Sequence, residues 1–300
     1  MQKTPITDIS SQSPETLYYL KEVSFYYDTG RKALESISLK IKTKEKILLL
    51  GPNGAGKSTL LQIMAGLISP QTGDVFLKRI PLFQYPENTL RKRVGFLFQN
   101  AEDQLVMPTV IEDVMFSLLN AGLEPDIARK KAESAIRLCG LEGLEERETT
   151  KLSAGEKKKA ALAGLLCLEP EILLLDEPTA GLDLSGKKNI ISFLSKLNCS
   201  MVIATHDIDA GLYLAKHVVV LNKKIHFDGP VQELLDNEKL LIQNNLEIPA
   251  FLKVFKAGIE SLRQDKAVED LSISSNNTNL PTTPEEAATK LKEAIVSVLK

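Results

Sequence analysis

Short strand-like segments and helical segments alternate along the chain. Residues 16–28 and 32–41 alternate apolar and polar positions, which is typical of strands with one buried face. Three short apolar runs, at 46–50, 172–175 and 201–204, are typical of buried parallel strands, whose carboxyl ends often carry function. The pattern therefore predicts an α/β fold with a mainly parallel sheet.

Helical periodicity separates these strands. A helix is predicted to begin near Lys57, after the apolar run that ends at Gly51. Residues 125–138 and 155–168 also repeat apolar positions at helical spacing, so we expect 100–168 to be a mainly helical insertion. No internal repeat interrupts this alternation.

After residue 230 the pattern changes, and we expect residues 235–300 to form a mainly helical C-terminal extension. A loosely amphipathic segment, 251–262, precedes a polar stretch at 272–283 that is predicted to be a linker. Residues 283–286 predict a capping box with proline at the first helical position. The following helix carries apolar residues on one face: Leu291, Ala294, Ile295, Val298 and Leu299. This face must be buried, either on the flank of the same subunit or against another subunit.

Composition and charge narrow the class of protein. The chain has 300 residues, of which 43% are hydrophobic and 25% charged, close to the average for a globular protein. Its net charge of −2 gives no basic field for gripping nucleic acid, so no nucleic-acid partner is expected. The longest apolar stretch, 160–168, is far shorter than the roughly 20 residues of a membrane-spanning helix. The polar N-terminus has no apolar signal segment, which predicts a cytosolic protein.

The spacing of cysteines and histidines indicates no metal site that is independent of a bound nucleotide. The three cysteines are too far apart for a CxxC pair and are expected to be small buried hydrophobic residues, and the three histidines form no ligand cluster: Cys139, Cys167, Cys199, His206, His217 and His226. Any metal is therefore expected to arrive with a nucleotide.

A phosphate-binding loop is the strongest local signal. Residues 51–58, GPNGAGKS, fit the pattern G-x-x-x-x-G-K-[ST] between a strand and a helix. Glycines let backbone N–H groups surround a β-phosphate, Lys57 supplies a positive charge to the β- and γ-phosphates, and the Ser58 hydroxyl can bind Mg²⁺. The residues expected to bind ATP here are Gly51, Pro52, Asn53, Gly54, Ala55, Gly56, Lys57, Ser58 and Thr59.

Two carboxylates end another predicted strand. In the segment 172–177, ILLLDE, four apolar residues place the strand in the core and deliver Asp176 and Glu177 at its end. Asp176 can hold the hydration shell of Mg²⁺, and Glu177 can polarise an attacking water. Alone this pattern is weak, but a phosphate loop in the same chain favours the catalytic interpretation.

A third motif suggests the family. Residues 152–159, LSAGEKKK, combine with the two motifs above, with AGLD at 180–183 and with THD at 205–207. In order and spacing, residues 18–235 resemble the ATPase subunit of ABC transporters. The resemblance implies a P-loop ATPase core with an antiparallel β subdomain and an inserted helical subdomain. It makes 1–234 the nucleotide-binding domain and 235–300 an extension that could mediate dimerisation.

The same resemblance implies a head-to-tail dimer with ATP between the subunits. The LSGGQ-type motif of one subunit closes over the nucleotide of the other, so Ser153, Gly155 and Glu156 become cofactor-binding residues. Asp183 matches the loop that couples the two sites. Here Ala154 replaces a usual glycine and Glu156 a usual glutamine, and the added negative charge is expected to weaken nucleotide affinity.

Three further positions carry over from the family. Gln99 matches the glutamine that touches Mg²⁺ and the attacking water, and His206 matches the switch histidine that binds the γ-phosphate. Tyr27 matches the aromatic residue that stacks on adenine, although packing within the sheet is nearly as good an interpretation and Tyr26 is an alternative stacking residue.

The class of transporter follows from segments outside these motifs. Residues 99–105, 109–114, 118–123, 155–159 and 245–249 resemble the ATPases of energy-coupling-factor importers, and within these the cobalt/nickel branch. The resemblance implies a second ATPase subunit in a homo- or heterodimer, a transmembrane coupling subunit, a substrate-binding membrane subunit and a peripheral position on the cytoplasmic face of the cell membrane. Vitamin importers have similar ATPases, so a vitamin importer remains an alternative.

Two other functions compete with an importer ATPase. A soluble ABC-type ATPase acting on nucleic acid or ribosomes usually has tandem cassettes or a long coiled-coil insertion, and neither is present. A module that binds ATP without turnover is disfavoured by Lys57, Asp176, Glu177 and His206, which together supply the groups that hydrolysis needs.

Overall fold

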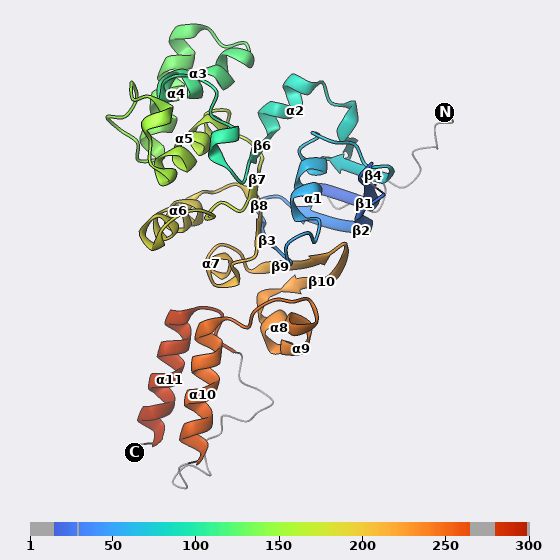
Figure 1. The fold of residues 1–300 in the computed structure, drawn as a ribbon, viewed down its shortest axis with the longest axis vertical. Helices are drawn as coiled ribbons and strands as arrows, with labels where there is room; N and C mark the ends of the chain where they lie inside the picture. Colours follow the sequence, from blue (N-terminus) through green and yellow to red (C-terminus); the bar gives the residue numbers. More distant parts are fainter. Residues whose placement is uncertain (1–14, 29, 265–279, 299–300) are drawn as a thin grey trace.

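The computed structural model describes residues 15–28, 30–264 and 280–298 (Figure 1), with the side chains of 261–264 and 295–298 left aside. The polar N-terminus, most of the expected linker and Leu299 therefore lie outside the described residues, as do the side chains of Ile295 and Val298.

The centre of the molecule is a six-stranded sheet in the order β10-β9-β3-β8-β7-β6. Every neighbouring pair is parallel except β9 and β10, which form an antiparallel hairpin. The strands are β3 (Lys46–Leu50), β6 (Val94–Leu97), β7 (Ile172–Asp176), β8 (Ser200–Thr205), β9 (His217–Asn222) and β10 (Lys224–Pro230). The predicted parallel sheet is confirmed, and the three apolar runs are its central strands.

A smaller antiparallel sheet, in the order β2-β1-β4-β5, covers one side of this core (Figure 1). Its strands are β1 (Thr16–Tyr26), β2 (Lys32–Lys42), β4 (Thr72–Leu77) and β5 (Ile80–Pro81). The alternating patterns at 16–28 and 32–41 are confirmed as β1 and β2, which pair in antiparallel register. Together with the inserted helices, this is the expected α/β fold.

Three helices form the inserted subdomain, α3 (Val110–Asn120), α4 (Pro125–Leu138) and α5 (Ala154–Leu166). Their apolar faces pack together and against Leu97, Leu173 and Leu175 of the sheet. The expected insertion is therefore helical. The pattern analysis did not predict α3, although Thr109 and Glu112 cap it reciprocally at its N-terminus.

Four further helices of the main body connect strands. They are α1 (Lys57–Met64), α2 (Glu87–Arg93), α6 (Leu184–Lys196) and α7 (Ile208–Leu212). Side chains of the central strands alternate between faces, so Ile47 and Leu49 pack toward α1 while Leu48 and Leu50 pack toward α7 and α8. Both faces of β3 are buried, which explains its uninterrupted apolar pattern.

The C-terminal extension has two parts. Helices α8 (Val231–Asp236) and α9 (Glu238–Gln243) lie against the sheet, and their cluster continues through Leu246 to Leu252. Beyond it, α10 (Ala250–Gln264) and α11 (Pro284–Val298) lie side by side and project from the body (Figure 1). The expected boundary at residue 234 falls inside α8, where Leu234 and Leu235 are buried in the same cluster.

The N-terminus of α11 departs from the predicted capping box. The Thr283 hydroxyl accepts a hydrogen bond from the Glu286 N–H at 3.2 Å, as expected. The Glu286 carboxylate, however, accepts from the N–H and hydroxyl of Thr282 rather than from Thr283. The apolar face of α11 is also covered from within the extension, because Ala287, Leu291 and Ala294 pack with α10.

His217, at the start of β9, contacts two carboxylates, one just before β3 and one in β10. Its Nδ1 lies 2.8 Å from Glu45 Oε1 and its Nε2 lies 2.6 Å from Asp228 Oδ1. These two hydrogen bonds raise the pKa of His217 to about 9, and the bond to Asp228 has the larger effect. Protonated His217 therefore stabilises the native state.

We expect the free energy of unfolding to be highest below about pH 6.5 and to fall as the pH rises through 9, because the native state holds this proton more tightly than the unfolded chain. Since the side chain is 30% exposed, solvent screening leaves a contribution on the order of 1–2 kcal/mol. Urea unfolding at pH 6.5 and 9 measures it. His217→Gln should lose this difference, whereas His226→Gln, at an exposed position of β10, should keep it. An unchanged pH profile in His217→Gln would contradict the assignment.

Candidate active site

One cavity of about 470 Å³ lies at the carboxyl ends of the parallel strands. Parallel register places the ends of β3, β8 and β7 side by side, with Leu50 opposite Thr205 and Ala204 opposite Asp176. The loops that follow these strands therefore meet at one edge of the sheet. The cavity is lined by Tyr27, Arg31, Ala33, Asn53, Gly54, Ala55, Gly56, Lys57, Ser58, Thr59, Gln99, Asp176, Glu177 and His206.

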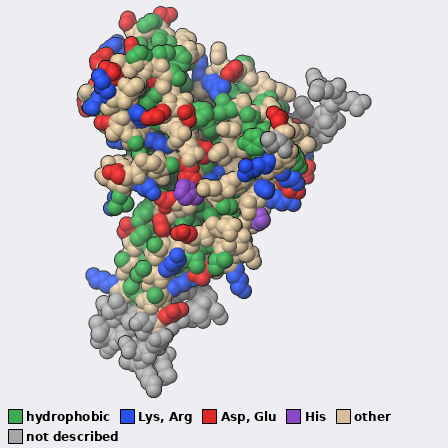
Figure 2. Space-filling view, viewed as in Figure 1, with side chains coloured by type: hydrophobic (Ala, Val, Ile, Leu, Met, Phe, Trp, Pro, Cys, Tyr) green, Lys and Arg blue, Asp and Glu red, His purple; other side chains and the backbone are tan. Residues whose placement is uncertain are grey.

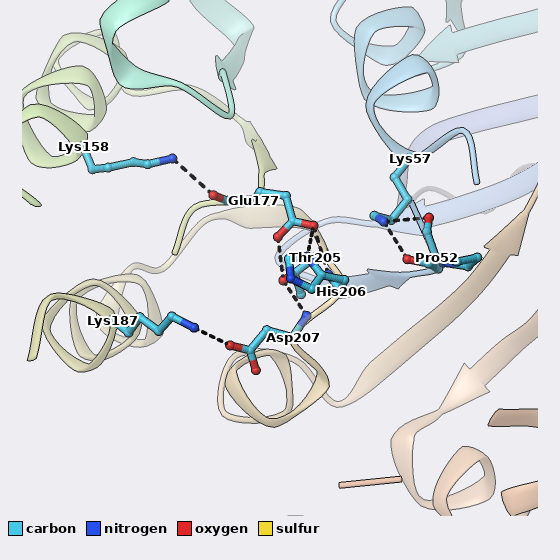
Figure 3. Close-up of polar contacts among 9 residues, drawn as sticks. Pro52, Lys57, Lys158, Glu177, Lys187, Thr205, His206 and Asp207 are labelled. Carbon is cyan, nitrogen blue, oxygen red and sulfur yellow. Dashed lines mark hydrogen bonds and ion pairs between the residues drawn. The ribbon is translucent and has the colours of Figure 1, made fainter. Parts of the chain in front are cut away.

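The loop between β3 and α1 forms the floor of this cavity. Its tight course depends on glycine: a Cβ on Gly51 would lie 2.1 Å from the Leu221 carbonyl oxygen, and Gly56, with φ of 101°, would bring a Cβ within 2.4 Å of the Ala33 carbonyl oxygen. The Lys57 Nζ folds back to donate to the carbonyl oxygens of Gly51 and Pro52 at 2.6 and 3.2 Å (Figure 3). Gly51 and Pro52 thus close the loop around Lys57 and do not line the cavity.

Asp176 ends β7 with one carboxylate oxygen unpaired. Its Oδ1 is buried without a hydrogen-bond partner among the described residues, while the Ser58 hydroxyl bonds the same side chain. Burial raises the pKa of Asp176, and the hydrogen bond from Ser58 opposes that rise. A buried, unpaired carboxylate oxygen beside a hydroxyl is a donor set that fits a divalent cation such as Mg²⁺.

Glu177 is fixed by hydrogen bonds on all sides, as Figure 3 shows. Its Oε2 accepts from the Thr205 hydroxyl at 3.0 Å, and its Oε1 accepts from the His206 N–H at 3.0 Å and lies 2.8 Å from His206 Nδ1. Its backbone adopts φ of 46°, which is unusual for a residue with a side chain. The carboxylate is thereby oriented toward the cavity together with His206.

Tyr27 and Tyr26 differ in position. Tyr27 lines the cavity, 44% exposed, and its hydroxyl lies 2.8 Å from Thr59 Oγ1. Tyr26 is outside the cavity lining, with its ring 5.5 Å from the Lys32 ammonium. Gln99 also lines the cavity and is exposed.

The residues of the 152–159 motif lie at a second cavity, of about 450 Å³, that shares no lining residue with the first. Ser153, Gly155, Glu156 and Asp183 all border it. The Ser153 hydroxyl accepts from the Glu156 N–H, and the Glu156 carboxylate accepts from the Ser153 N–H at 2.8 Å. This capping box at α5 lowers the pKa of Glu156, so its negative charge compensates the helix terminus as well as facing the cavity.

Several residues at the first cavity were missed by the sequence analysis. Arg31 borders it next to Gly54, and Thr205 holds Glu177. Lys187 forms an ion pair with Asp207, the N-cap of α7, at 3.0 Å. Lys158, part of the quoted motif, is buried below Gln99 and Glu177. Thr205 and Asp207 stand in the 205–207 motif and Lys158 in the 152–159 motif, but their contacts depend on tertiary packing.

The described residues contain no group of three or more His, Cys, Asp or Glu side chains arranged to hold a metal ion. They also contain no helix that is long and apolar enough to cross a membrane. On the face drawn in Figure 2, acidic and basic side chains are interspersed over the main body.

The fold and this cavity define a P-loop ATPase. The family model described as "ABC transporter" matches residues 34–180. The energy-coupling factor transporter ATP-binding protein EcfA of Methanoculleus marisnigri is 36% identical over 257 residues, which cover 84% of this chain and 91% of EcfA. The chain belongs to the ATP-binding subunits of ABC transporters, the ATPases that power transport across membranes.

Two solved structures agree with this family in fold. The cbiO1 protein of Clostridium perfringens, described as part of the ABC transporter complex cbiONQ, has a TM-score of 0.67 at 34% identity and covers 78% of this chain and 96% of cbiO1. A dimeric ATP-binding cassette in a post-hydrolysis state, bound to ADP and phosphate, has a TM-score of 0.64 at 28% identity and covers 71% of this chain and 98% of the cassette.

Proposed function

We propose that the chain binds and hydrolyses Mg-ATP in the first cavity to power an importer of the energy-coupling-factor type. The observation that supports this most is the meeting of the phosphate loop, Asp176, Glu177 and His206 around one cavity. In this proposal residues 53–59 hold the phosphates, on a loop that Gly51 and Pro52 close. Tyr27 contacts adenine, and Glu177 activates the attacking water with His206 at the γ-phosphate. Residues 1–234 carry this activity, with packing that continues to Leu252.

Mg²⁺ would be held by the Ser58 hydroxyl, the unpaired Asp176 oxygen and Gln99. When bound, it neutralises charge that develops on the phosphate oxygens. The protein's own part is to position these oxygen donors at the edge of the sheet.

We further propose that the second cavity closes over the nucleotide of a second subunit. Ser153, Gly155 and Glu156 border it together with Asp183, at a distance in the fold from the phosphate loop of the same chain. One chain therefore cannot bring its own motif onto its own nucleotide without rearrangement. The dimeric cassette of similar fold supports a head-to-tail arrangement.

Glu177→Gln with ATP is expected to shift the chain from monomer to dimer, because unhydrolysed ATP keeps linking Lys57 of one copy to Ser153 of the other. Size-exclusion chromatography with light scattering, with and without ATP, measures this. Glu177→Gln combined with Ser153→Arg should remain monomeric. A monomer at high concentration of Glu177→Gln with ATP would argue against a homodimer and favour a heterodimer.

The protruding helices α10 and α11 are proposed to hold two subunits together when the nucleotide sites open. Their cluster, with Phe255, Ile259 and Ala287, meets the cluster against the sheet through Phe251 and Leu280, and Val254 is 66% exposed on α10. Truncation after Lys253 is therefore expected to reduce nucleotide-free dimerisation while the melting temperature changes little. A large loss of thermal stability with unchanged association would show that the helices only stabilise the monomer.

The proposed partners are a transmembrane coupling subunit and a substrate-binding membrane subunit, which hold the ATPase on the cytoplasmic face of the membrane. The proposed docking surface is the segment 99–104 beside the helical insertion. Glu102 and Asp103 in it are both exposed, and Glu102 forms an ion pair with Lys157. The proposed cargo is cobalt or nickel, because residues 99–105, 109–114 and 245–249 resemble the cobalt/nickel branch of these importers.

Co-purification followed by uptake in reconstituted vesicles tests this function. Wild-type chain should co-purify with a polytopic membrane protein, and Asp103→Lys should weaken the complex while its ATPase activity is kept. Vesicles with the whole complex should take up radioactive Co²⁺ or Ni²⁺ only when ATP is supplied. Uptake of a vitamin instead would reassign the cargo, and co-purification with nucleic acid or ribosomes would overturn the importer.

A further inference from the structure

Lys158 is a buried cation beneath the active site. It lies on α5, five residues after Ser153, and is 4% exposed. Its Nζ donates to the Gln99 carbonyl oxygen at 2.5 Å and to the Glu177 carbonyl oxygen at 3.2 Å (Figure 3 shows the second contact). No ion pair between described residues involves it. One ammonium group thus joins three segments that are far apart in the sequence.

This arrangement costs free energy that packing alone would not require. Burial lowers the pKa of Lys158, and the nearby negative charges of Asp176 and Glu177 oppose that effect. A methionine of similar length would fill the same space without burying a charge. The ammonium of Lys158 donates hydrogen bonds to two backbone carbonyls, and this indicates that it positions them.

The Glu177 carbonyl is a sensitive point for such a contact. Glu177 has a left-handed backbone conformation, with φ of 46°, and surrounding contacts must maintain it. The Glu177 N–H donates to Ala204, and the Glu177 carbonyl accepts from the Ala180 N–H as well as from Lys158. If the contact with Lys158 is lost, this carbonyl keeps the hydrogen bond from the Ala180 N–H but loses its bond to the ammonium, so the peptide after Glu177 is freer to rotate and to change the direction of the carboxylate.

We propose that Lys158 is a positioning residue that ties helix α5 and the Gln99 segment to the backbone of Glu177. Through this single ammonium group, displacement of residues 99–104 by a bound partner would be transmitted to the catalytic carboxylate. The inference rests on the proposed role of Glu177 in hydrolysis. It assigns Lys158 no contact with the nucleotide.

Lys158→Met tests the proposal in the full-length chain. Loss of a charge-assisted hydrogen bond that orients the glutamate is expected to lower kcat about 10- to 100-fold. KM for ATP and the equilibrium affinity for a non-hydrolysable ATP analogue should stay within about threefold, since the phosphate loop is untouched. Lys157→Met is the matched control, because the neighbouring lysine pairs with Glu102 at the surface. It should keep wild-type kcat.

A double-mutant cycle separates this inference from the function on which it rests. In Glu177→Gln the further change Lys158→Met should have almost no effect on the residual turnover, because there is no longer a carboxylate to orient. If Glu177→Gln alone keeps wild-type turnover, the proposed role of Glu177 in hydrolysis fails. The role of Lys158 fails if Glu177→Gln has lost its turnover but Lys158→Met keeps the kcat of the wild type. It also fails if Lys158→Met lowers turnover by the same factor in the wild-type chain and in Glu177→Gln.

A folding defect would be recognised separately. Melting temperature and analogue binding of Lys158→Met should remain close to those of the wild type. Should the methionine variant not fold, Lys158→Gln, which keeps an N–H donor on a shorter chain, is measured instead. It is expected to lower kcat with KM unchanged, and a parallel loss of kcat and analogue affinity would overturn the proposal.

Discussion

Glu177→Gln is expected to bind Mg-ATP nearly as well as the wild type and to hydrolyse it about 10²- to 10⁴-fold more slowly. Glutamine keeps the size of the side chain and can still accept from the Thr205 hydroxyl, so the site should remain assembled. It lacks the carboxylate that would take a proton from the attacking water. Phosphate release under saturating ATP measures kcat, and equilibrium binding of ATP measures affinity.

Glu169→Gln provides the control for this variant, because Glu169 lies just before β7 at the other end and its side chain is 78% exposed. Its turnover should match that of the wild type. Near wild-type turnover in Glu177→Gln would refute the role of Glu177 as the base and direct attention to His206, which lies 2.8 Å away.

Lys57→Ala is expected to lower kcat/KM for ATP about 10²- to 10³-fold, with a loss of nucleotide affinity that Glu177→Gln does not show. Lys57 is 7% exposed, and its ammonium is held by two loop carbonyls at the edge of the cavity. Alanine removes this charge from beneath the phosphates and leaves the two carbonyls without their donor. Steady-state kinetics and titration with an ATP analogue separate the two effects.

Lys42→Ala, on the exposed edge of β2, is the control for loss of a lysine and should have wild-type kinetics. Should Lys57→Ala retain wild-type kcat/KM, the phosphate loop would not be the nucleotide site. A variant that also melts at a much lower temperature would show instead that the lysine mainly stabilises the loop, and Lys57→Arg would then be measured for binding.

Much of the fold was predictable because each central strand is buried on both faces. Runs such as 46–50 and 172–175 are continuously apolar for that reason, and their ends carry the polar residues. Less regular elements were not predicted. Helix α3 was missed although it has a capping box, and the two-part packing of the extension depends on contacts between residues that are distant in sequence.

The sequence by itself determined which chemical groups are present and in what order, because a phosphate loop, a strand ending in two carboxylates and the 152–159 motif are each defined by local spacing. It also determined the strands that bring the phosphate loop and the two carboxylates together, since the burial of a strand follows directly from its local hydrophobic pattern.

Only the tertiary structure decided how these groups meet. It placed Tyr27 rather than Tyr26 at the cavity, separated the 152–159 motif into a second cavity, and set Lys158 beneath Glu177. The physical reason is that these relations depend on the register between strands and on the packing of an inserted subdomain against the sheet. Such contacts join residues far apart in the chain, and local spacing carries no information about them.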